Sequence, residues 1–280
     1  MGLDVVLVIG AGGALVVGSV LLLRRPLARW LSARLGRARA EPLPAGWADR
    51  VAAVMPAFIR LTAAERDKLL RDMRDLLSTR SWEGAGGLEL TDEIRLTIAA
   101  QACLLTLGFE GDPYPSLHTI LVYPSTFVPA SPFSWTARGR TGREEPTLGE
   151  SWTDGVIVLA WDQAAAGGAG PDDGENVVLH EFAHQLDRGD GEMDGVPRMP
   201  SADYRAWAAV IAREYQSLER AAREGRSDVL DEYGATDPAE FFAVATETFF
   251  ERPKDLQRER PELYDALRRY YRQDPGRRER

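Results

Sequence analysis

The stretch Val177-Val-Leu-His-Glu-Phe-Ala-His-Gln-Leu-Asp187 holds two histidines and a glutamate in the pattern His-Glu-x-x-His. Residues four apart lie on one face of an α-helix, so the imidazoles of His180 and His184 can bind the same metal ion. Glu181 falls on the adjacent flank, where its carboxylate can act as general base on a water molecule at the metal. The motif therefore predicts a zinc-dependent hydrolase built around a metal-binding helix.

The composition is that of a soluble globular protein with a sizeable core. The chain has 280 residues, of which 44% are hydrophobic and 28% charged, and its net charge is −9. Six arginines and one acid lie in residues 1–40, so the remainder is more acidic still. An acidic body argues against a nucleic-acid partner, because phosphates need a basic surface. The single cysteine, Cys103, cannot form an internal disulfide and is predicted to be a buried thiol.

The N-terminal segment is predicted to anchor the protein in a membrane. Residues 1–24 form one transmembrane helix in this interpretation, because the apolar run Val5–Leu23 is just long enough to cross a bilayer core. Residues 25–44 are predicted to be a basic juxtamembrane segment and linker, and residues 45–280 the domain that carries the metal motif. The arginines behind the apolar run place that domain in the cytoplasm, at the inner or plasma membrane, after a single pass. A cleaved signal peptide fits less well, because no basic region precedes the apolar run.

Three further features of this segment bear on its function. Val5–Leu15 resembles the strand and turn of a dinucleotide-binding motif, but its sixth position lacks the required glycine or alanine, so that cofactor is not expected. Gly10, Ala14 and Gly18 would let two such helices approach closely, although small residues are common in membrane helices. Arg24–Arg39 has the pattern of a basic amphipathic helix that lies on anionic lipid.

Periodicity and capping signals predict an α+β domain, mainly helical, with a small sheet beside the metal helix. Thr62-Ala-Ala-Glu65 is a capping-box signature that opens one helix. The glycine-rich stretch Ala164–Gly174 predicts a flexible loop, in which Asp172, with Glu175 after it, can cap the metal helix. The predicted helices are Trp47–Arg60, Thr62 to about Ser78, Thr91 to before Gly108, Ala202–Arg223, Pro238–Phe250 and Pro261–Arg272, and the predicted strands are Thr119–Tyr123 and Val156–Trp161.

A catalytic zinc site needs a third protein ligand and one open position for water. Glu240 is the best candidate, because it lies in the first turn of a helix that Asp237 caps and Pro238 begins. Metal binding would explain why this carboxylate lies beside an apolar helix face. The alternative is that it only stabilises the dipole at the helix N-terminus. His118 fits less well, since an ordinary satisfied or exposed histidine is expected at the start of a strand.

Three stretches of the chain resemble the Mlc titration factor A family of zinc peptidases. They are His180–Asp187, Asp194–Pro197 and Tyr233–Ala243, and a weaker likeness extends over Leu121–Pro124 and Ser151–Trp161. The resemblance covers most of residues 45–275. The segment that runs from Tyr233 to Glu240 is also similar to the catalytic core of anthrax lethal factor. Both resemblances imply a zincin-like metallopeptidase domain of the gluzincin type, in which a downstream glutamate is the third ligand.

The resemblance implies that His180, His184 and Glu240 bind one Zn²⁺ ion per chain. It also implies that Glu181 is the general base and that Tyr233 lies near the metal. The chemistry of these residues agrees, because a carboxylate can pass a proton from water to the leaving amine and a phenol can hydrogen-bond a developing oxyanion. The resemblance further implies a peptide substrate, aminopeptidase-type cleavage, and a repressor-type protein partner linked to the regulation of sugar uptake.

The sequence does not identify which acid orients a ligand imidazole. Many gluzincins have a second carboxylate four residues after the ligand glutamate, and Val244 stands at that position here. Glu247, one turn further along, is one substitute. Asp187, three residues after His184, is the other, since a hydrogen bond to an imidazole would orient the ring. Asp187 fits equally well as an ordinary acid at a helix end.

Two functions remain in competition. The first is a peptidase, in which the edge of the strand Gly155–Trp161 pairs with an extended substrate, as the resemblance implies. The alternative is a metal-stabilised binding module that titrates a transcriptional regulator at the membrane with little hydrolysis. Glu181 favours the enzyme, because a purely structural zinc site usually closes on four ligands and needs no base.

Overall fold

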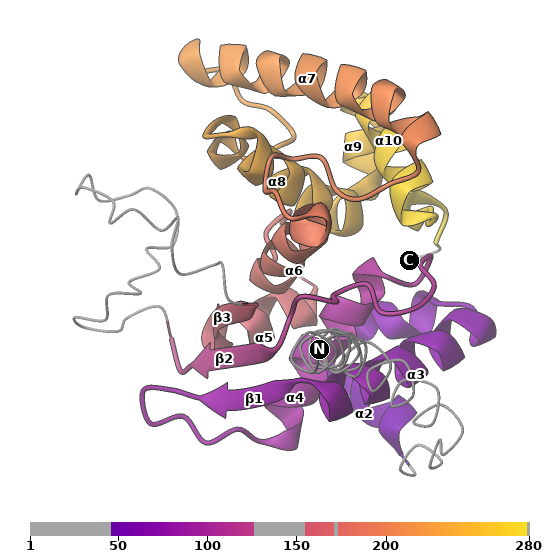
Figure 1. Cartoon of the computed structure of the whole chain (residues 1–280), viewed down its shortest axis with the longest axis vertical. Coiled ribbons are helices and arrows are strands. Elements are labelled where there is room, and N and C mark those ends of the chain that lie inside the picture. Colours follow the sequence, from indigo (N-terminus) through magenta and orange to yellow (C-terminus); the bar gives the residue numbers. More distant parts are fainter. Residues whose placement is uncertain (1–45, 126–154, 171–172, 279–280) are drawn as a thin grey trace, which may run out of the picture. The chain divides into compact units, whose positions relative to one another are not determined.

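The computed structural model describes residues 46–125, 155–170 and 173–278 (Figure 1). These residues belong to one compact unit of the chain. The predicted transmembrane helix of residues 1–24 and the basic segment of residues 25–44 lie outside the described residues. Within the described part of the chain, no helix combines the length and the apolarity that crossing a bilayer requires.

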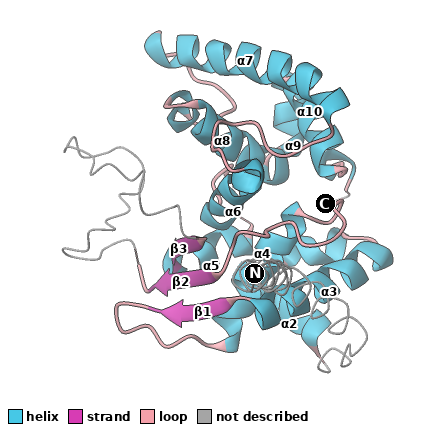
Figure 2. Ribbon diagram, in the orientation of Figure 1, coloured by secondary structure: helices cyan, strands magenta, loops and turns pink. Residues whose placement is uncertain are grey.

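The described chain is mainly helical and contains one small sheet, which confirms the predicted α+β class (Figure 2). The α-helices are α2 (Trp47–Val54), α3 (Ala63–Thr79), α4 (Asp92–Leu105), α5 (Trp161–Ala169), α6 (Val177–Asp187), α7 (Ser201–Arg223), α8 (Pro238–Glu251), α9 (Pro253–Glu259) and α10 (Pro261–Tyr271). Short 3-10 turns are η1 (Pro56–Arg60), η3 (Arg188–Asp190), η4 (Glu232–Ala235) and η5 (Pro275–Arg277). The predicted capping box of α3 is present: Thr62 and Glu65 exchange hydrogen bonds through side chain and backbone.

Three parallel strands form the sheet: β1 (Ser81–Gly84), β2 (Thr119–Tyr123) and β3 (Val156–Ala160). β2 lies in the middle, so β3 forms one edge of the sheet. β2 and β3 were predicted, except that the chain turns helical at Trp161, one residue earlier than expected. β1 was not predicted, because its sequence Ser-Trp-Glu-Gly lacks an apolar alternation and is largely exposed.

The predicted helix Trp47–Arg60 is wrong in one respect, because it breaks in the middle. α2 ends at Val54, Met55 has φ −142° and ψ 87°, and a 3-10 turn starts at Pro56. Proline has no amide hydrogen to donate, and it disfavours the α conformation in the residue before it. The break lets Phe58 enter the core, where it is almost fully buried.

The prediction of a flexible loop over Ala164–Gly174 is also wrong for its first half. α5 runs through Trp161–Ala169, and Gly167 and Gly168 are buried within it. A Cβ on Gly167 would lie 2.8 Å from the side chain of Asn176. The glycines therefore let α5 approach its neighbours closely, and packing holds a stretch that local propensity would leave as a loop.

The metal helix α6 lies between two groups of elements (Figure 1). Before it come the sheet and α2 to α5, which we call the N-terminal lobe; after it come α7 to α10, the C-terminal lobe. α6 contacts β3, α4 and α5 on one side and α8 on the other. Proline begins α8, α9 and α10, a position where its missing amide hydrogen costs no helical bond. The arrangement places α6 and α8 side by side at the centre.

Candidate metal centre

The predicted metal-binding motif lies on α6, which is buried along its whole length. Asn176 caps the helix, and its side-chain oxygen accepts a hydrogen bond from the Leu179 amide at 3.0 Å. His180 and His184 follow one turn apart, and their Nε2 atoms are 3.2 Å from each other. The two imidazoles thus direct one nitrogen each to the same point.

Glu240 reaches that point from the first turn of α8. Asp237 caps this helix, and its Oδ1 accepts hydrogen bonds from the amides of Ala239 and Glu240, both at 2.9 Å. The Oε2 atom of Glu240 then lies 3.0 Å from Nε2 of His180 and 3.5 Å from Nε2 of His184. Two helices that are far apart in the sequence therefore bring these three side chains together.

The three candidate ligand atoms fit a zinc ion. Atoms bound to one tetrahedral zinc at about 2.0–2.1 Å lie about 3.3 Å from one another, and the separations here are 3.0, 3.2 and 3.5 Å. Two imidazoles and one carboxylate are a donor set of catalytic zinc sites, which keep a fourth position open. In residues 46–125, 155–170 and 173–278, no other group of three His, Cys, Asp or Glu side chains has this arrangement.

Glu181 lies beside the histidines and is only 1% exposed. Its Oε2 has no hydrogen-bond partner in the described part of the chain. Burial raises the pKa of this carboxyl to about 7, although the neighbouring His180 and His184 act to lower it. A general base works best with a pKa near the operating pH, so the environment of Glu181 suits the role that the motif predicts.

Glu247, on α8, lies behind His180. Its Oε1 is 2.7 Å from Nδ1 of His180, the ring nitrogen that faces away from the candidate metal position. A carboxylate at this place fixes the tautomer and the orientation of the ring. Of the two acids that the sequence left as candidates, Glu247 is the one that the structure brings to a ligand imidazole.

Asp187 is fully buried at the end of α6, and its carboxylate binds the loop that follows this helix. Its Oδ2 accepts a hydrogen bond from the amide of Gly195 at 2.8 Å. A Cβ on Gly195 would lie 2.3 Å from the carbonyl oxygen of Pro238, the first residue of α8. Asp187 is closest in sequence to the ligand His184, but Nδ1 of His184 has no hydrogen-bond partner among the described residues. Asp187 therefore anchors the loop after α6 against the start of α8.

Asn176 was not among the predicted functional residues, yet it joins the two helices of the site. Its backbone amide donates a hydrogen bond to Glu247, and its Nδ2 donates one to Glu251 at 2.9 Å. It is also the N-cap of α6, which corrects the prediction that Asp172 with Glu175 caps this helix. Asp172 lies outside the described residues. The preference of asparagine for N-cap positions is the signal that identifies Asn176.

Tyr233 lies in η4, the turn that precedes α8. Asp231 fixes this turn, because its Oδ1 accepts a hydrogen bond from the Tyr233 amide at 2.9 Å. The centre of the phenol ring is 6.1 Å from that of the His180 ring, and the phenol lies near the carboxylate of Glu240. Burial raises the pKa of Tyr233, and the carboxylates around it raise that pKa further. The phenol therefore keeps its proton at neutral pH and can donate a hydrogen bond.

The electrostatics of the site favour a cation. Burial alone would lower the pKa of His180, but the carboxylates of Glu247 and Glu240 outweigh it and raise that pKa well above its usual range. Burial alone would raise the pKa of Glu240, but hydrogen bonds with His180 and His184 outweigh it and lower that pKa. The buried carboxylates thus stabilise positive charge between the imidazoles.

Two other residues considered from the sequence lie away from the site. His118 is exposed at the start of β2 and takes no part in the cluster of ligand atoms. Cys103 is buried in α4 and has a free thiol, as expected. Burial raises the pKa of this thiol well above its usual range, which leaves it unreactive.

Comparison with known proteins gives consistent matches over most of the chain. The model of the family described as glucose-regulated metallo-peptidase M90 matches residues 27–272. An uncharacterised protein of Synechocystis is 43% identical over 250 residues, which are 88% of this chain and 90% of the relative. Mlc titration factor A of Serratia proteamaculans is 33% identical over 244 residues, 85% of this chain and 90% of its own. Its counterpart in Salmonella arizonae is 31% identical over 243 residues, 83% of this chain and 92% of its own.

Proposed function

The chain belongs to the glucose-regulated metallo-peptidase M90 family, and we propose that it is a zinc peptidase that hydrolyses peptide bonds. The observation that carries this proposal is the convergence of three ligand atoms beside the buried carboxylate of Glu181, one oxygen of which has no partner in the described chain. A structural zinc site usually closes on four ligands. Three donors and an adjacent base support hydrolysis instead.

The side chains of the site take distinct roles in this reaction. His180, His184 and Glu240 would hold the ion. Zinc bound there would polarise the scissile carbonyl and lower the pKa of a water molecule at the open position. Glu181 accepts a proton from the attacking water and delivers it to the leaving amine. Glu247 holds the proton of His180 on Nδ1, which leaves the lone pair of Nε2 for the ion.

Tyr233 completes the proposed machinery as a hydrogen-bond donor. As the carbonyl carbon becomes tetrahedral, its oxygen gains negative charge, and the phenol donates a hydrogen bond to it. The closeness of Tyr233 to His180 and the raised pKa of its phenol support this role.

We propose that the substrate docks as an extended strand along Gly155–Trp161. β3 lies at the edge of the sheet and contacts α6, which supports this position. Backbone hydrogen bonds to an edge strand give affinity for a peptide without demanding a particular sequence. Cleavage near the free N-terminus of such a peptide is the aminopeptidase-type activity that we propose. Proline substitutions in β3 that leave peptide turnover intact would rule this pairing out.

The decisive experiment is Glu181→Gln, which keeps the size of the side chain and removes the base. We expect the purified full chain to retain one zinc ion by elemental analysis and to lose about 10²–10⁴-fold in the cleavage of a peptide library. In the same assay, Tyr233→Phe should keep its zinc and lose about 10²-fold in turnover. Wild-type activity in Glu181→Gln would show that the base lies elsewhere. Full zinc content in Glu240→Ala would exclude Glu240 as a ligand.

A second candidate function is the binding of a transcriptional regulator, with the metal site as structural support. The name Mlc titration factor A, carried by several relatives, favours it. In this alternative, Glu181→Gln would bind the regulator as wild type does, and the peptide library would stay uncleaved by either protein. Measuring both readouts on the same two proteins therefore separates the two functions.

We propose that the catalytic domain works at the cytoplasmic face of a membrane. The apolar run Val5–Leu23 and the arginines that follow it support this location. Fractionation of cells should recover the full chain with membranes, and a variant that begins at residue 41 should be recovered in the supernatant. A full chain that fractionates with the supernatant would contradict the proposal.

A further inference from the structure

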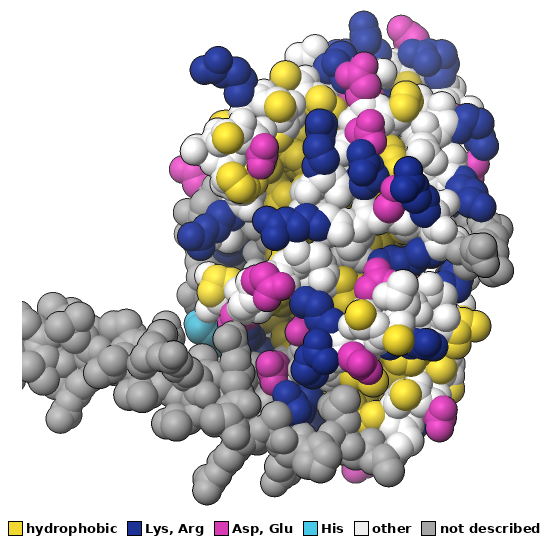
Figure 3. Space-filling model, turned by 90° about the vertical axis from the view of Figure 1, so that its right-hand side faces the viewer, with side chains coloured by type: hydrophobic (Ala, Val, Ile, Leu, Met, Phe, Trp, Pro, Cys, Tyr) yellow, Lys and Arg dark blue, Asp and Glu magenta, His cyan; other side chains and the backbone are white. Residues whose placement is uncertain are grey.

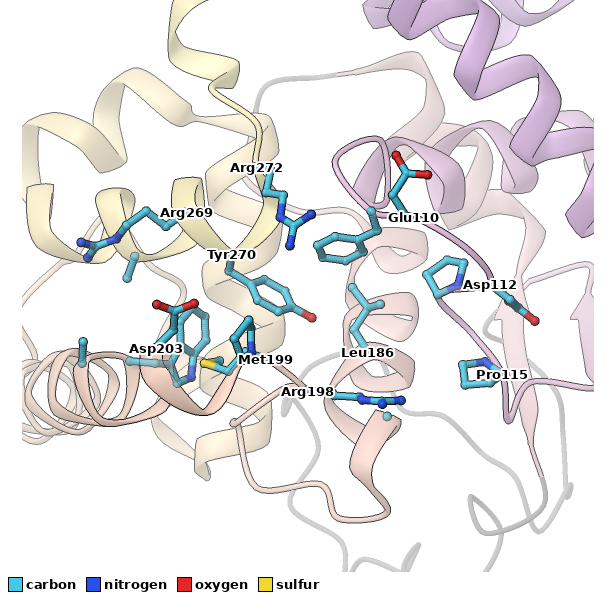
Figure 4. A pocket seen from close by; sticks show the side chains of 17 residues that line it. Glu110, Asp112, Pro115, Leu186, Arg198, Met199, Asp203, Arg269, Tyr270 and Arg272 are labelled. Atoms are coloured by element: carbon cyan, nitrogen blue, oxygen red, sulfur yellow. The ribbon is translucent and has the colours of Figure 1, made fainter.

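A cleft with a volume of about 880 Å³ lies behind the metal helix, between the two lobes (Figure 4). Residues 109–115 of the N-terminal lobe line one side, and α7 and α10 of the C-terminal lobe line the other. Leu186, on α6, forms part of the floor. Leu186 follows His184 by two residues, which is about 200° around the helix. The cleft, which we call the rear cleft, therefore lies on the side of α6 that faces away from the metal ligands.

The rear cleft has an aromatic and apolar surface. Phe109 meets Tyr270 edge to face with ring centres 5.3 Å apart, and Trp207 lies 5.3 Å from Tyr270. Leu186 and Met199 extend this surface. Phe109 and Tyr270 are only half-buried, so parts of their rings are open to a ligand. The volume falls within the range of ligand-binding clefts, roughly 300–1,000 Å³.

Guanidinium groups stand at two ends of this surface. Arg272 points across the cleft from the end of α10, and Arg198 extends below Leu186 (Figure 4). Both side chains are exposed, and within the described residues neither has a carboxylate partner. On the face of the molecule shown in Figure 3, Lys and Arg side chains are numerous and hydrophobic atoms show between them. The rear cleft thus combines unpaired positive charge with an apolar surface.

The acids that line the cleft do not neutralise these two arginines. Both carboxylate oxygens of Asp112 accept hydrogen bonds from Arg80, at 2.8 and 2.7 Å. Glu110 is exposed, and its carboxylate points away from the cleft (Figure 4). Asp203 lies in the first turn of α7, where the helix dipole stabilises its charge, and Arg269 is a third lining arginine.

The backbone of Arg272, directly after α10, is strained. It has φ 51° and ψ 37°, and within residues 46–125, 155–170 and 173–278 it is the one non-glycine residue with positive φ. Glycine is the usual residue in this left-handed conformation after a helix, because an L side chain crowds the backbone there. Strain of this kind tends to mark functional positions, and here it accompanies a guanidinium group aimed into the cleft.

We propose that the rear cleft binds an acidic peptide segment. A large apolar side chain of the segment packs against Phe109 and Tyr270, and its carboxylates pair with Arg198 and Arg272. Arginine and aromatic residues, without lysine, are the composition of binding hot spots on protein surfaces. The planar guanidinium group also matches a carboxylate in a bidentate geometry. The proposal concerns binding alone and stands independently of the proposed peptidase function.

Anisotropy of fluorescein-labelled Glu-Leu-Trp-Leu-Glu-amide, titrated with the full chain, tests this proposal. Arg272→Gly removes the guanidinium group and relaxes the backbone, and Arg198→Gln removes the second positive charge. The matched control is Arg205→Gln, because Arg205 is exposed on α7 and does not line the cleft. We expect affinity to fall about tenfold in each cleft variant, and to change less than about twofold in the control.

Two further measurements separate lost binding from unfolding and test whether the carboxylates of the peptide contribute to binding. The melting temperature of Arg272→Gly should equal or exceed that of wild type, so unfolding cannot explain lost binding. A peptide with glutamine at both ends should bind about tenfold more weakly.

Unchanged affinity of Arg272→Gly, or an equal loss in Arg205→Gln, would overturn the proposal. Loss of binding on chelation of zinc would also overturn it, because the peptide would then occupy the metal site. Displacement of the peptide by equimolar benzoate would show that the ligand is a small organic anion and not a peptide.

Discussion

One hydrogen bond sets which nitrogen of His180 faces the candidate metal position. Glu247 Oε1 lies 2.7 Å from Nδ1, so Nδ1 carries the proton and the lone pair of Nε2 points toward Glu240. Nδ1 of His184 lacks such a partner among the described residues. The two imidazoles therefore differ in how firmly they are oriented, and the loss of Glu247 should affect zinc binding more than the loss of any other acid behind the ligands.

Glu247→Gln should weaken zinc binding about 10–100-fold, because an outer carboxylate orients the ligand imidazole and raises its basicity. Glutamine keeps an acceptor for the Asn176 amide, so the junction of α6 and α8 is preserved. The dissociation constant is measured by competition with a chromophoric chelator. The control is Asp187→Asn, which keeps an acceptor for the Gly195 amide and should leave zinc affinity unchanged. Wild-type affinity in Glu247→Gln would show that this acid does not tune the ligand.

Spacing along single helices made part of the candidate site predictable from the sequence. The four-residue period placed His180 and His184 on one face, and the capping signals around Asp237 placed Glu240 in a first turn. The choice between Asp187 and Glu247 could not be made in this way. Glu247 is 67 residues from His180, and their contact depends on how two helices dock. The N-cap position of Asn176 has a local signal, but its contacts with Glu247 and Glu251 depend on the same docking of the two helices.

α5 is a helix built from residues that do not favour one. Glycine costs about 1 kcal/mol relative to alanine in a helix interior, and two adjacent glycines, Gly167 and Gly168, lie within this helix. Local propensity therefore predicts a loop, and only contacts with distant segments make the helix stable. The break of α2 before Pro56, by contrast, is a local effect that the sequence already contains. The predicted elements thus differ from the observed ones for two reasons. Tertiary packing stabilises α5 against local propensity, and Pro56 ends a helix that was predicted to continue.

Gly167→Ala should destabilise the protein by about 1–3 kcal/mol, although alanine is the better helix former. The new Cβ would lie 2.8 Å from the side chain of Asn176, which caps the metal helix. Urea unfolding measures the change in the free energy of unfolding, and zinc affinity should fall with it. The control is Ala166→Gly on the exposed side of α5, which should cost about 1 kcal/mol and leave zinc affinity unchanged. A Gly167→Ala protein more stable than wild type would contradict this account of α5.

The two central helices join parts of the chain that are distant in sequence. α6 contacts the N-terminal lobe through β3, α4 and α5, and α8 contacts η4, α9 and α10 of the C-terminal lobe. The ligand set is divided between them, with His180 and His184 on α6 and Glu240 on α8. An ion bound by all three side chains therefore acts as a cross-link at the centre of the described unit. Its binding free energy contributes to the stability of the whole folded unit.

Removal of zinc should lower the melting temperature of the protein. An ion present at 1,000 times its dissociation constant stabilises the folded state by about 4 kcal/mol. For a domain of this size each kcal/mol corresponds to roughly 2–4 °C, so chelation should lower the melting temperature by roughly 8–16 °C. Thermal unfolding is followed by circular dichroism, with and without a chelator and after zinc is restored. Glu240→Ala is the control, because a chain that cannot close the ligand set should melt at the same temperature in all three conditions. Equal melting temperatures for wild type with and without zinc would mean that the ion does not link α6 to α8.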